Sequence, residues 1–225
     1  SDRFVFYNIS QFSQKKGIDS LLRSYFGAFH GKQDDVVLLL KTYVNMAGRS
    51  QEQEKLRAYV NSVKQGMRLS ADGYPPVMLV TKTLTEEQIR KIHKTGDAYV
   101  CSSRGEGWCI PAFDALTYGN KLVTTTWGGM GEFAVGKNNV YEVDYSMQPL
   151  VGQNHADPEL YTSADLVAEP SIKSMMDQMT AAYNDRDTTK PASNMTEFDH
   201  SVVGPNMLRV IEEVAASKTK ETSNV

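Results

Sequence analysis

The sequence predicts an α/β fold built on one doubly wound parallel sheet. Short apolar runs of strand length alternate with longer segments of helical periodicity between residues 4 and 143, a pattern typical of parallel sheets with right-handed crossover connections. The 225 residues are 40% hydrophobic and 23% charged, which suits a single globular domain with a buried core. In such a sheet, ligands bind beyond the carboxyl ends of the strands.

In the first half of the chain, strands are predicted where short apolar or β-rich runs occur, at residues 4–9, 36–44, 77–80 and 98–101. The second run is apolar except for Lys41 and Thr42, as expected for a strand buried on both faces. Helices are predicted from apolar spacing and capping residues at 17–29, 50–67 and 85–94. The last of these begins with Thr85-Glu86-Glu87-Gln88, which matches a capping box.

Beyond residue 101 the predicted elements are a helix at 111–118, strands at 121–125 and 140–143 (the latter an edge strand), and helices at 171–183 and 206–216. Residues 145–170 show little periodicity and contain three prolines, so we expect an extended loop over the surface. Residues 184–195 are polar and loop-like, and residues 217–225 are expected to form a frayed tail.

Composition and charge exclude several classes of protein. The formal net charge is -3 with no basic block, so nucleic acid is not expected as a partner. No apolar run reaches the roughly 18 residues of a spanning helix, and the N-terminus lacks a charged-then-apolar leader. A disulfide between Cys101 and Cys109 is possible, but two reduced thiols in a cytoplasmic protein are the better interpretation.

Residues 102–132 carry the strongest functional signal. Glu106 and Asp114 are separated by seven residues and flank a Gly-Trp-Cys-Ile-Pro turn. Pro111 suits the first position of a helix, where its missing N–H costs nothing, and the free N–H groups of a helix start can hold an anion such as a diphosphate. Glu106, on the loop before the helix, can accept hydrogen bonds from sugar hydroxyls. The pattern indicates a site for a phosphorylated, hydroxyl-rich ligand.

This segment resembles the Glu-x7-Glu signature of retaining GT-B glycosyltransferases of the family 4, or group 1, type. The family pattern is approximately S-R-x-E-G-x-G-x-P-x-x-E-A-x-x-x-G, followed by a strand and G-G-x-x-E. The chain matches it at Ser103, Arg104, Glu106, Gly107, Pro111, Ala115, Gly119, Gly128, Gly129 and Glu132. Asp114 stands where Glu is usual, which shortens its reach by one methylene. Cys109 stands where Gly is usual, which puts a side chain close to the expected phosphate and sugar.

The resemblance implies the C-terminal, donor-binding half of a GT-B fold. It predicts a nucleotide-sugar-binding Rossmann-like domain over residues 1–184, and a C-terminal helix and tail over residues 185–225. The implied reaction is retaining transfer of a sugar from a nucleoside diphosphate sugar to a glycan, lipid or protein acceptor, with no metal and no cofactor. Glu106 would hold the sugar, Asp114 would bind the ribose, and Lys16 would stabilise the departing diphosphate. The remaining donor-binding candidates are Lys15, Lys41, Gly107, Trp108, Cys109, Ile110, Gly129 and Glu132.

A second cluster, residues 10–17, follows the first predicted strand. Its equivalent in the family is approximately G-R-x-x-x-x-K-G, in which Arg and Lys neutralise the diphosphate. Lys16-Gly17 matches, but Ser10-Gln11 replaces Gly-Arg and removes one positive charge. Lys15 and Lys41 are candidates to replace that charge, although a solvated surface lysine is an equal alternative for Lys41.

Other motifs are less specific. The run from Gly129 to Ala134 fits the dinucleotide fingerprint G-x-G-x-x-A, but it follows the fifth predicted strand and not the first, so a loop that approaches the sugar and phosphates closely is the better interpretation. Asp185-Arg186-Asp187 imitates an Asp-x-Asp metal motif but lies in a polar segment typical of a solvated turn. The four histidines show no ligand spacing, so no zinc site is expected from them.

Two alternatives to a glycosyltransferase remain open for the function. GT-B enzymes have two such domains, and this sequence resembles only the second, so a missing N-terminal domain or a partner chain is expected to complete an enzyme. A non-catalytic module that holds a nucleotide sugar, or serves only in interactions, is the first alternative. A nucleotide-sugar epimerase or a sugar phosphorylase of similar fold is the second, although the additional groups those reactions need are not evident.

Overall fold

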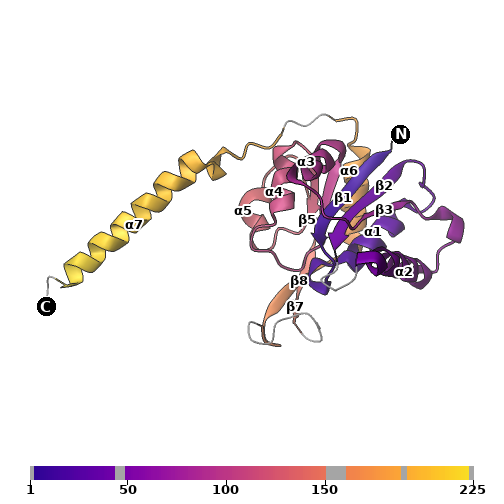
Figure 1. Ribbon diagram of the computed structural model, residues 1–225, viewed down its shortest axis with the longest axis horizontal. Coiled ribbons are helices and arrows are strands. Elements are labelled where there is room, and N and C mark those ends of the chain that lie inside the picture. Colours follow the sequence, from indigo (N-terminus) through magenta and orange to yellow (C-terminus); the bar gives the residue numbers. More distant parts are fainter. Residues whose placement is uncertain (1–2, 44–48, 151–160, 189–191, 223–225) are drawn as a thin grey trace. The chain divides into compact units, whose positions relative to one another are not determined.

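The computed structural model describes residues 3–43, 49–150, 161–188 and 192–222. The chain forms two compact units, Ser1–Ser193 and Asn194–Val225. The first unit contains the sheet and the helices that pack on it, and the second contains a long helix (Figure 1).

The main sheet of the first unit is parallel throughout and has six strands in the order β3-β2-β1-β4-β5-β6. Its strands are β1 (Phe4–Gln11), β2 (Val36–Tyr43), β3 (Val77–Val80), β4 (Ala98–Cys101), β5 (Lys121–Thr124) and β6 (Val140–Glu142). This order confirms the predicted doubly wound sheet, and β6 is an edge strand as expected. The strand order reverses between β1 and β4, and a crevice for ligands opens at such a point in this class of fold.

Helices cover both faces of the sheet (Figure 1). They are α1 (Ile18–Phe29), α2 (Arg49–Met67), α3 (Glu86–Thr95), α4 (Ile110–Thr117), α5 (Met130–Ala134) and α6 (Ile172–Asn184), with short 3-10 turns η1 (Gln14–Lys16) and η2 (Ala71–Gly73). Side chains of successive β1 residues point to opposite faces of the sheet, as in any strand. Phe6 packs against Tyr25 and Phe29 of α1, whereas Tyr7 contacts His93 of α3 and Tyr99 of β4.

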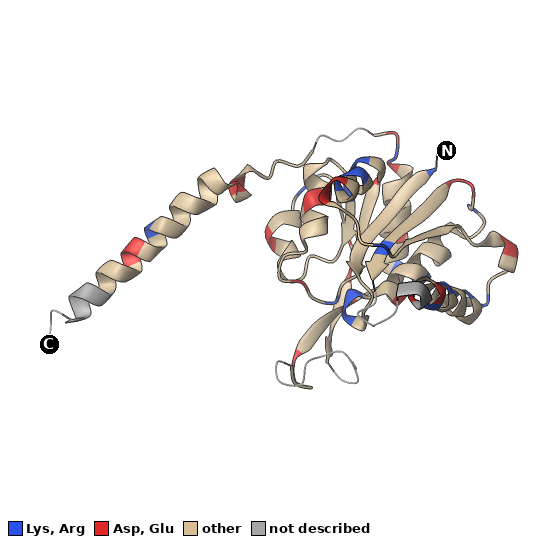
Figure 2. Ribbon diagram, viewed as in Figure 1, with Lys and Arg blue, Asp and Glu red and all other residues tan. Residues whose placement is uncertain are grey.

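A local sequence signal explains where α3 begins. The capping box at α3 is present, because the Thr85 hydroxyl accepts from the Gln88 N–H and the Gln88 side chain accepts from the Thr85 N–H. On α2 and α3, acidic and basic residues are interspersed (Figure 2). The pairs Arg90–Glu86 and Lys91–Glu87 at 3.3 and 2.9 Å are exposed, so each contributes little to stability.

Two elements differ from the sequence prediction in the first unit. Residues 145–170, expected as a loop, instead contain an antiparallel pair of strands, β7 (Tyr145–Pro149) and β8 (Leu166–Pro170). Pro149 and Pro170 lie at the ends of this ladder, where a missing N–H is tolerated, and most β7 side chains are exposed, so no alternating pattern is visible. The short helix α5 was also not predicted.

In the second unit the helix is longer than predicted. After a 3-10 turn, η3 (Thr196–Phe198), α7 spans His200–Thr222, whereas the sequence predicted a helix at 206–216 and a frayed tail. Pro205 lies inside α7, past its first turn, so it removes one helical hydrogen bond there because proline has no N–H. Asp199 precedes the helix and accepts from the Ser201 N–H at 2.8 Å. Within the described part of the chain, no helix combines the length and apolar character needed to cross a bilayer.

Candidate functional site

Two loops that are far apart in the sequence are joined at the carboxyl ends of β1 and β4. The Ser102 hydroxyl donates to the Lys16 carbonyl at 2.8 Å, and the Ser103 hydroxyl donates to the Lys15 carbonyl at 3.2 Å. The Arg104 N–H also donates to the Lys15 carbonyl, at 2.8 Å. These hydrogen bonds fix the loop after β1 against the loop after β4, so both sequence clusters predicted to bind a ligand lie together.

The backbone conformation and surroundings of residue 17 explain why a glycine is needed after Lys16. Its φ of 61° lies in the left-handed region, where side chains are disfavoured. A Cβ atom at this position would lie 2.1 Å from the Ser102 carbonyl oxygen, which belongs to the backbone and cannot rotate away. The close approach of the two loops therefore requires glycine here.

The glycine cluster after β5 supports the same loop from the other side. The Gly129 N–H donates to the Glu106 carbonyl at 3.0 Å, and a Cβ at Gly129 would lie 1.9 Å from the Gly107 carbonyl oxygen. We expected this glycine cluster to lie close to the sugar and phosphates. In the structure, Gly129 lies close to the backbone of the loop that carries Glu106. Glu132, in the first turn of α5, is exposed.

The loops enclose a cavity of about 540 Å³ at the carboxyl ends of β1, β2 and β4. Its walls are formed by Asn8, Ile9, Ser10, Gln11, Lys16, Lys41, Tyr43, Tyr99, Cys101, Ser103, Glu106, Trp108, Cys109, Ile110 and Pro111. A cavity of this volume is in the range that small-molecule ligands occupy. It lies beside β1 and β4, where the strand order reverses, which is where ligands bind in open α/β sheets.

Lys16 and Glu106 form an ion pair in this cavity. The Lys16 Nζ lies 2.5 Å from the Glu106 Oε1, and their side chains are 22% and 14% exposed. One group follows β1 and the other follows β4, so the fold brings together the two residues predicted to act on the phosphates and on the sugar. Each charge is the partner of the other in this structure, and an anionic ligand would have to share or displace that contact.

The two additional lysines differ in position. Lys41, near the end of β2, lines the cavity and is only 8% exposed. Burial lowers the pKa of its ammonium, and the charge of Glu52 partly opposes this shift. Lys15 is exposed and points instead to Tyr161, whose hydroxyl accepts from its Nζ at 3.3 Å. Of the two candidates, only Lys41 is on the cavity wall.

The residue that precedes α4, Cys109, has a left-handed backbone conformation. Cys109 has φ 62° and ψ 69°, an uncommon conformation for a residue with a Cβ. The Ala112 N–H donates to the Cys109 carbonyl at 3.0 Å, and Pro111 has no N–H, so an anion at this helix start would have to be held by amides that precede Pro111. Trp108 packs against Phe113 and Phe133, with ring centroids 5.7 and 5.1 Å away, which fixes the turn on α4 and α5.

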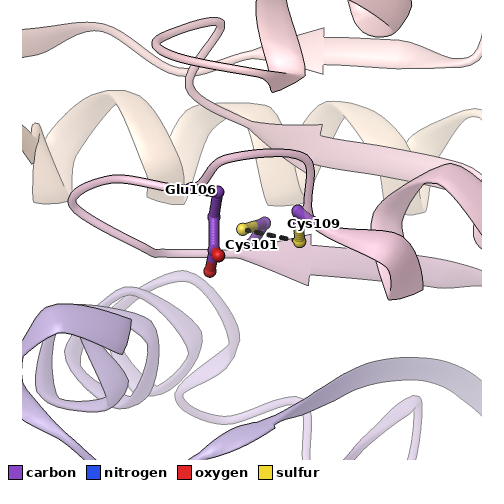
Figure 3. A group of neighbouring side chains, drawn as sticks. All are labelled: Cys101, Glu106 and Cys109. Carbon is purple, nitrogen blue, oxygen red and sulfur yellow. Dashed lines mark hydrogen bonds between the residues drawn. The ribbon is translucent and has the colours of Figure 1, made fainter.

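Cys101 and Cys109 are free thiols whose sulfur atoms lie 3.7 Å apart. Their hydrogen bond lowers the pKa of the Cys101 thiol and raises that of Cys109. With Glu106 they form the one group in the described residues whose His, Cys or carboxylate atoms are arranged so that they could hold a metal ion. Figure 3 shows the two sulfurs facing each other, with the Glu106 side chain beside them.

Asp114 lies one turn into α4 and outside the cavity lining. Its Oδ2 is 4.0 Å from the Nε2 of His93, a side chain that is almost fully buried. Burial raises the pKa of the Asp114 carboxyl, and His93 partly counteracts this. The Asn120 amide donates to the Tyr7 hydroxyl at 2.7 Å, and that hydroxyl shares a hydrogen bond of 2.9 Å with His93 Nδ1.

Sequence reasoning missed the role of Arg104. Its guanidinium forms a bidentate ion pair with Glu169 of β8 and also donates to the Gln14 carbonyl. The Ala168 N–H donates back to the Arg104 carbonyl at 3.0 Å. Arg104 thus ties the strand pair β7–β8 to both site loops. The segment containing Glu169 was predicted as a loop, so no sequence signal linked the two residues.

The Asp-Arg-Asp motif has a structural role. The Asp185 carboxylate accepts from the Tyr141 hydroxyl at 2.7 Å, and the Arg186 guanidinium lies over the Tyr183 ring at 4.5 Å. The Asp-Arg-Asp motif is thus engaged at the end of α6. Asn8, Tyr43 and Tyr99 line the cavity and were not predicted; the only signal for Asn8 was a polar residue within an apolar strand.

Several solved structures have a similar fold. The chain is similar to the UDP-forming α,α-trehalose-phosphate synthases of Burkholderia vietnamiensis (TM-score 0.60, 12% identity, 97% of this chain and 45% of that one) and Burkholderia xenovorans (0.59, 12%, 94% and 44%). It is equally similar to the α,α-trehalose 6-phosphate synthase of Burkholderia multivorans (0.59, 11%, 96% and 44%). The sequence matches no family model and no curated protein.

These similarities define the class of fold. The chain has the Rossmann-like α/β fold of one half of a GT-B glycosyltransferase, as the sequence predicted. It spans less than half the length of these three synthases.

Proposed function

We propose that this chain is the C-terminal, donor-binding domain of a retaining, metal-independent glycosyltransferase. It binds a nucleoside diphosphate sugar, and the sugar passes to a glycan, lipid or protein acceptor held by a further domain or chain. The observation that carries the proposal is the ion pair of Lys16 with Glu106 across two loops of one cavity. A cation and a carboxylate at this point fit a ligand that carries both phosphates and hydroxyls.

Different residues of the site contact different parts of the donor. Lys16, with Lys41 also on the cavity wall, offsets the negative charge that develops on the leaving diphosphate. Preorganised charge of this kind usually contributes more to catalysis than any other single effect. Released from Lys16, the Glu106 carboxylate accepts hydrogen bonds from sugar hydroxyls. The amides before Pro111 provide further donors to the phosphates, as helix starts do.

Asp114 lies on α4, outside the cavity lining. Its carboxylate is 42% exposed and therefore within reach of a ligand that extends out of the cavity along α4. In the proposal it accepts hydrogen bonds from the ribose hydroxyls. Gly107, Gly129 and Glu132 act by shaping the loop and its surroundings.

A second function, a nucleotide-sugar-binding module without transferase activity, is favoured by one observation. Ser10 and Gln11 line the cavity where the related enzymes carry Gly-Arg. Among the residues described on the cavity wall, the cations are Lys16 and Lys41, and none is arginine. A missing positive charge weakens stabilisation of the leaving diphosphate more than it weakens binding of the donor, because the negative charge on that group grows in the transition state.

Isothermal titration with UDP, GDP and ADP tests the proposal. UDP is the first probe because the structural neighbours are named UDP-forming enzymes. We expect one diphosphate to bind, and Lys16→Ala to weaken it at least about tenfold, as loss of a charge-assisted hydrogen bond does. Glu106→Gln should spare the diphosphate and weaken the matching nucleotide sugar.

Matched controls remove the same charge elsewhere. Lys94→Ala alters an exposed lysine in the last turn of α3, and Glu54→Gln alters an exposed carboxylate on α2; neither should change affinity. No binding of any diphosphate near millimolar concentration contradicts the proposal. Turnover of the bound nucleotide sugar distinguishes the transferase from the binding module.

A further inference from the structure

We propose that Cys101, Cys109 and Glu106 form a binding site for Zn²⁺ or a similar thiophilic cation inside the cavity. The assignment rests on the positions of the three ligand atoms, on the charge around them and on their access to the cavity. It does not depend on the proposed donor function, although its consequence for the donor does.

The spacing of the sulfurs suits one tetrahedral cation. With Zn–S bonds of about 2.3 Å, two thiolates on a tetrahedral zinc are about 3.8 Å apart, and the two sulfurs here are 3.7 Å apart. A disulfide would require about 2.05 Å. The Glu106 carboxylate lies within 4.8 Å of both sulfurs, and about 1 Å of movement would bring it to the roughly 3.6 Å expected for an oxygen ligand.

The surrounding charge balances such a centre. Two thiolates and one carboxylate outweigh a divalent cation by one negative charge, and the Lys16 ammonium, 2.5 Å from Glu106 Oε1, supplies one positive charge. The cation can therefore take the other carboxylate oxygen while Lys16 keeps its contact. Binding releases the two thiol protons to solvent, as metal binding by cysteine requires.

The site is buried yet open on one side. Cys101 is only 3% exposed, but all three ligand residues and Lys16 line the cavity. Three protein ligands leave the fourth position of a tetrahedral zinc to water or to a ligand oxygen. This position faces the cavity in which the donor sugar is proposed to lie.

The consequence for the donor site is inhibition. A cation that holds Glu106 removes the carboxylate proposed to bind sugar hydroxyls, so it should compete with the nucleotide sugar. The conformation of the motif turn favours this role for Cys109: its left-handed backbone places a thiol where the related enzymes have only a hydrogen atom.

The test uses the reduced chain under nitrogen with metal alone. Co²⁺ should bind one equivalent and give the near-ultraviolet charge-transfer absorption of thiolate ligands, and Zn²⁺ should displace it. Cys101→Ser and Cys109→Ser should each weaken Zn²⁺ binding more than about 100-fold, beyond the 10–100-fold typical of losing an outer-shell partner. Glu106→Gln should weaken binding but keep the thiolate absorption, and the control Glu54→Gln should have no effect.

A measurement on the unmodified chain guards against variants that fail to fold. Saturating Zn²⁺ should protect the partly exposed Cys109 thiol from alkylation by a maleimide. Co²⁺ binding without thiolate absorption, or alkylation unaffected by Zn²⁺, would overturn the site. Because nucleotide is absent from these experiments, their failure is distinct from a failure to bind diphosphate, which would leave the metal site standing.

Discussion

The interior of the first unit and the carboxyl edge of its sheet contain different kinds of residue. Between the sheet and α1, large apolar side chains such as Phe6, Tyr25 and Phe29 are fully buried and contact one another. At the edge, polar loops are joined by hydrogen bonds, Lys16 and Glu106 are partly buried charges, and Cys109 is left-handed. The comparison teaches that packing in the interior stabilises the fold, whereas the edge of the sheet holds charged groups and a strained residue at the place where a ligand can bind.

The largest effect on stability is expected from the interior. Phe29 is fully buried and packs against Phe6 and Tyr183, so Phe29→Ala should lower the free energy of unfolding by about 3–5 kcal/mol. Phe29→Leu, which keeps most of the volume, should cost less than about 1.5 kcal/mol. Denaturant unfolding measures both. A loss at Phe29→Ala below about 1 kcal/mol would show that this interior is not the source of stability.

Gly17 lies where the two regions meet, and its substitution sharpens the comparison. Gly17→Ala should cost about 1–3 kcal/mol and also abolish diphosphate binding, because the new Cβ separates the loop after β1 from Ser102. Gly31→Ala is the matched control: its φ of 83° is also left-handed, but a Cβ there meets no atom within 4 Å. Equal losses of stability and affinity in the two variants would contradict the close-contact argument.

The buried His93 predicts a pH dependence of stability. Burial lowers its pKa below the ordinary 6.5, with Asp114 partly opposing. The unfolded chain therefore takes up a proton near pH 6.5 that the folded chain does not, so stability should fall as pH decreases through that value, by up to about 1 kcal/mol per pH unit. Thermal unfolding between about pH 8 and pH 5 measures it. His93→Asn should flatten the profile, and an unchanged slope would argue against His93.

The smallest expected effect is at Cys109. Its left-handed conformation costs of order 1 kcal/mol in a residue with a Cβ, so Cys109→Gly should raise the free energy of unfolding by a few tenths to about 1 kcal/mol. Cys109→Ser keeps the strain and should leave stability nearly unchanged. Chemical denaturation of both variants, in parallel with the unmodified chain, measures these changes in the free energy of unfolding. Destabilisation by glycine would mean that the thiol contributes more than the backbone conformation costs.

The sequence predicted regular elements and missed contacts between distant segments. The strand runs and the Thr85 capping box are local signals, and their elements form where predicted. The ladder between β7 and β8 has exposed side chains and terminal prolines, which leave no periodicity to detect. The bidentate contact of Arg104 with Glu169 joins residues far apart in the chain, so no spacing rule reveals it.

The same limit applies to the candidate site. Lys16 and Glu106 were predicted from separate motifs, and the structure places them 2.5 Å apart. The difference between Lys15, directed to Tyr161, and Lys41, on the cavity wall, depends on side-chain direction. Neighbouring lysines look alike in a sequence, so this distinction required the three-dimensional arrangement.

The central claim is that the cavity at the ends of β1, β2 and β4 holds a nucleoside diphosphate. The most direct test is amide mapping by ¹H–¹⁵N NMR as UDP, GDP and ADP are added in turn. The account predicts that one of them shifts the amides of Lys16, Gly17, Cys109 and Ile110 together, while those of β7 and β8 stay largely in place. Shifts confined to residues outside the two site loops, or none with any diphosphate, would contradict it.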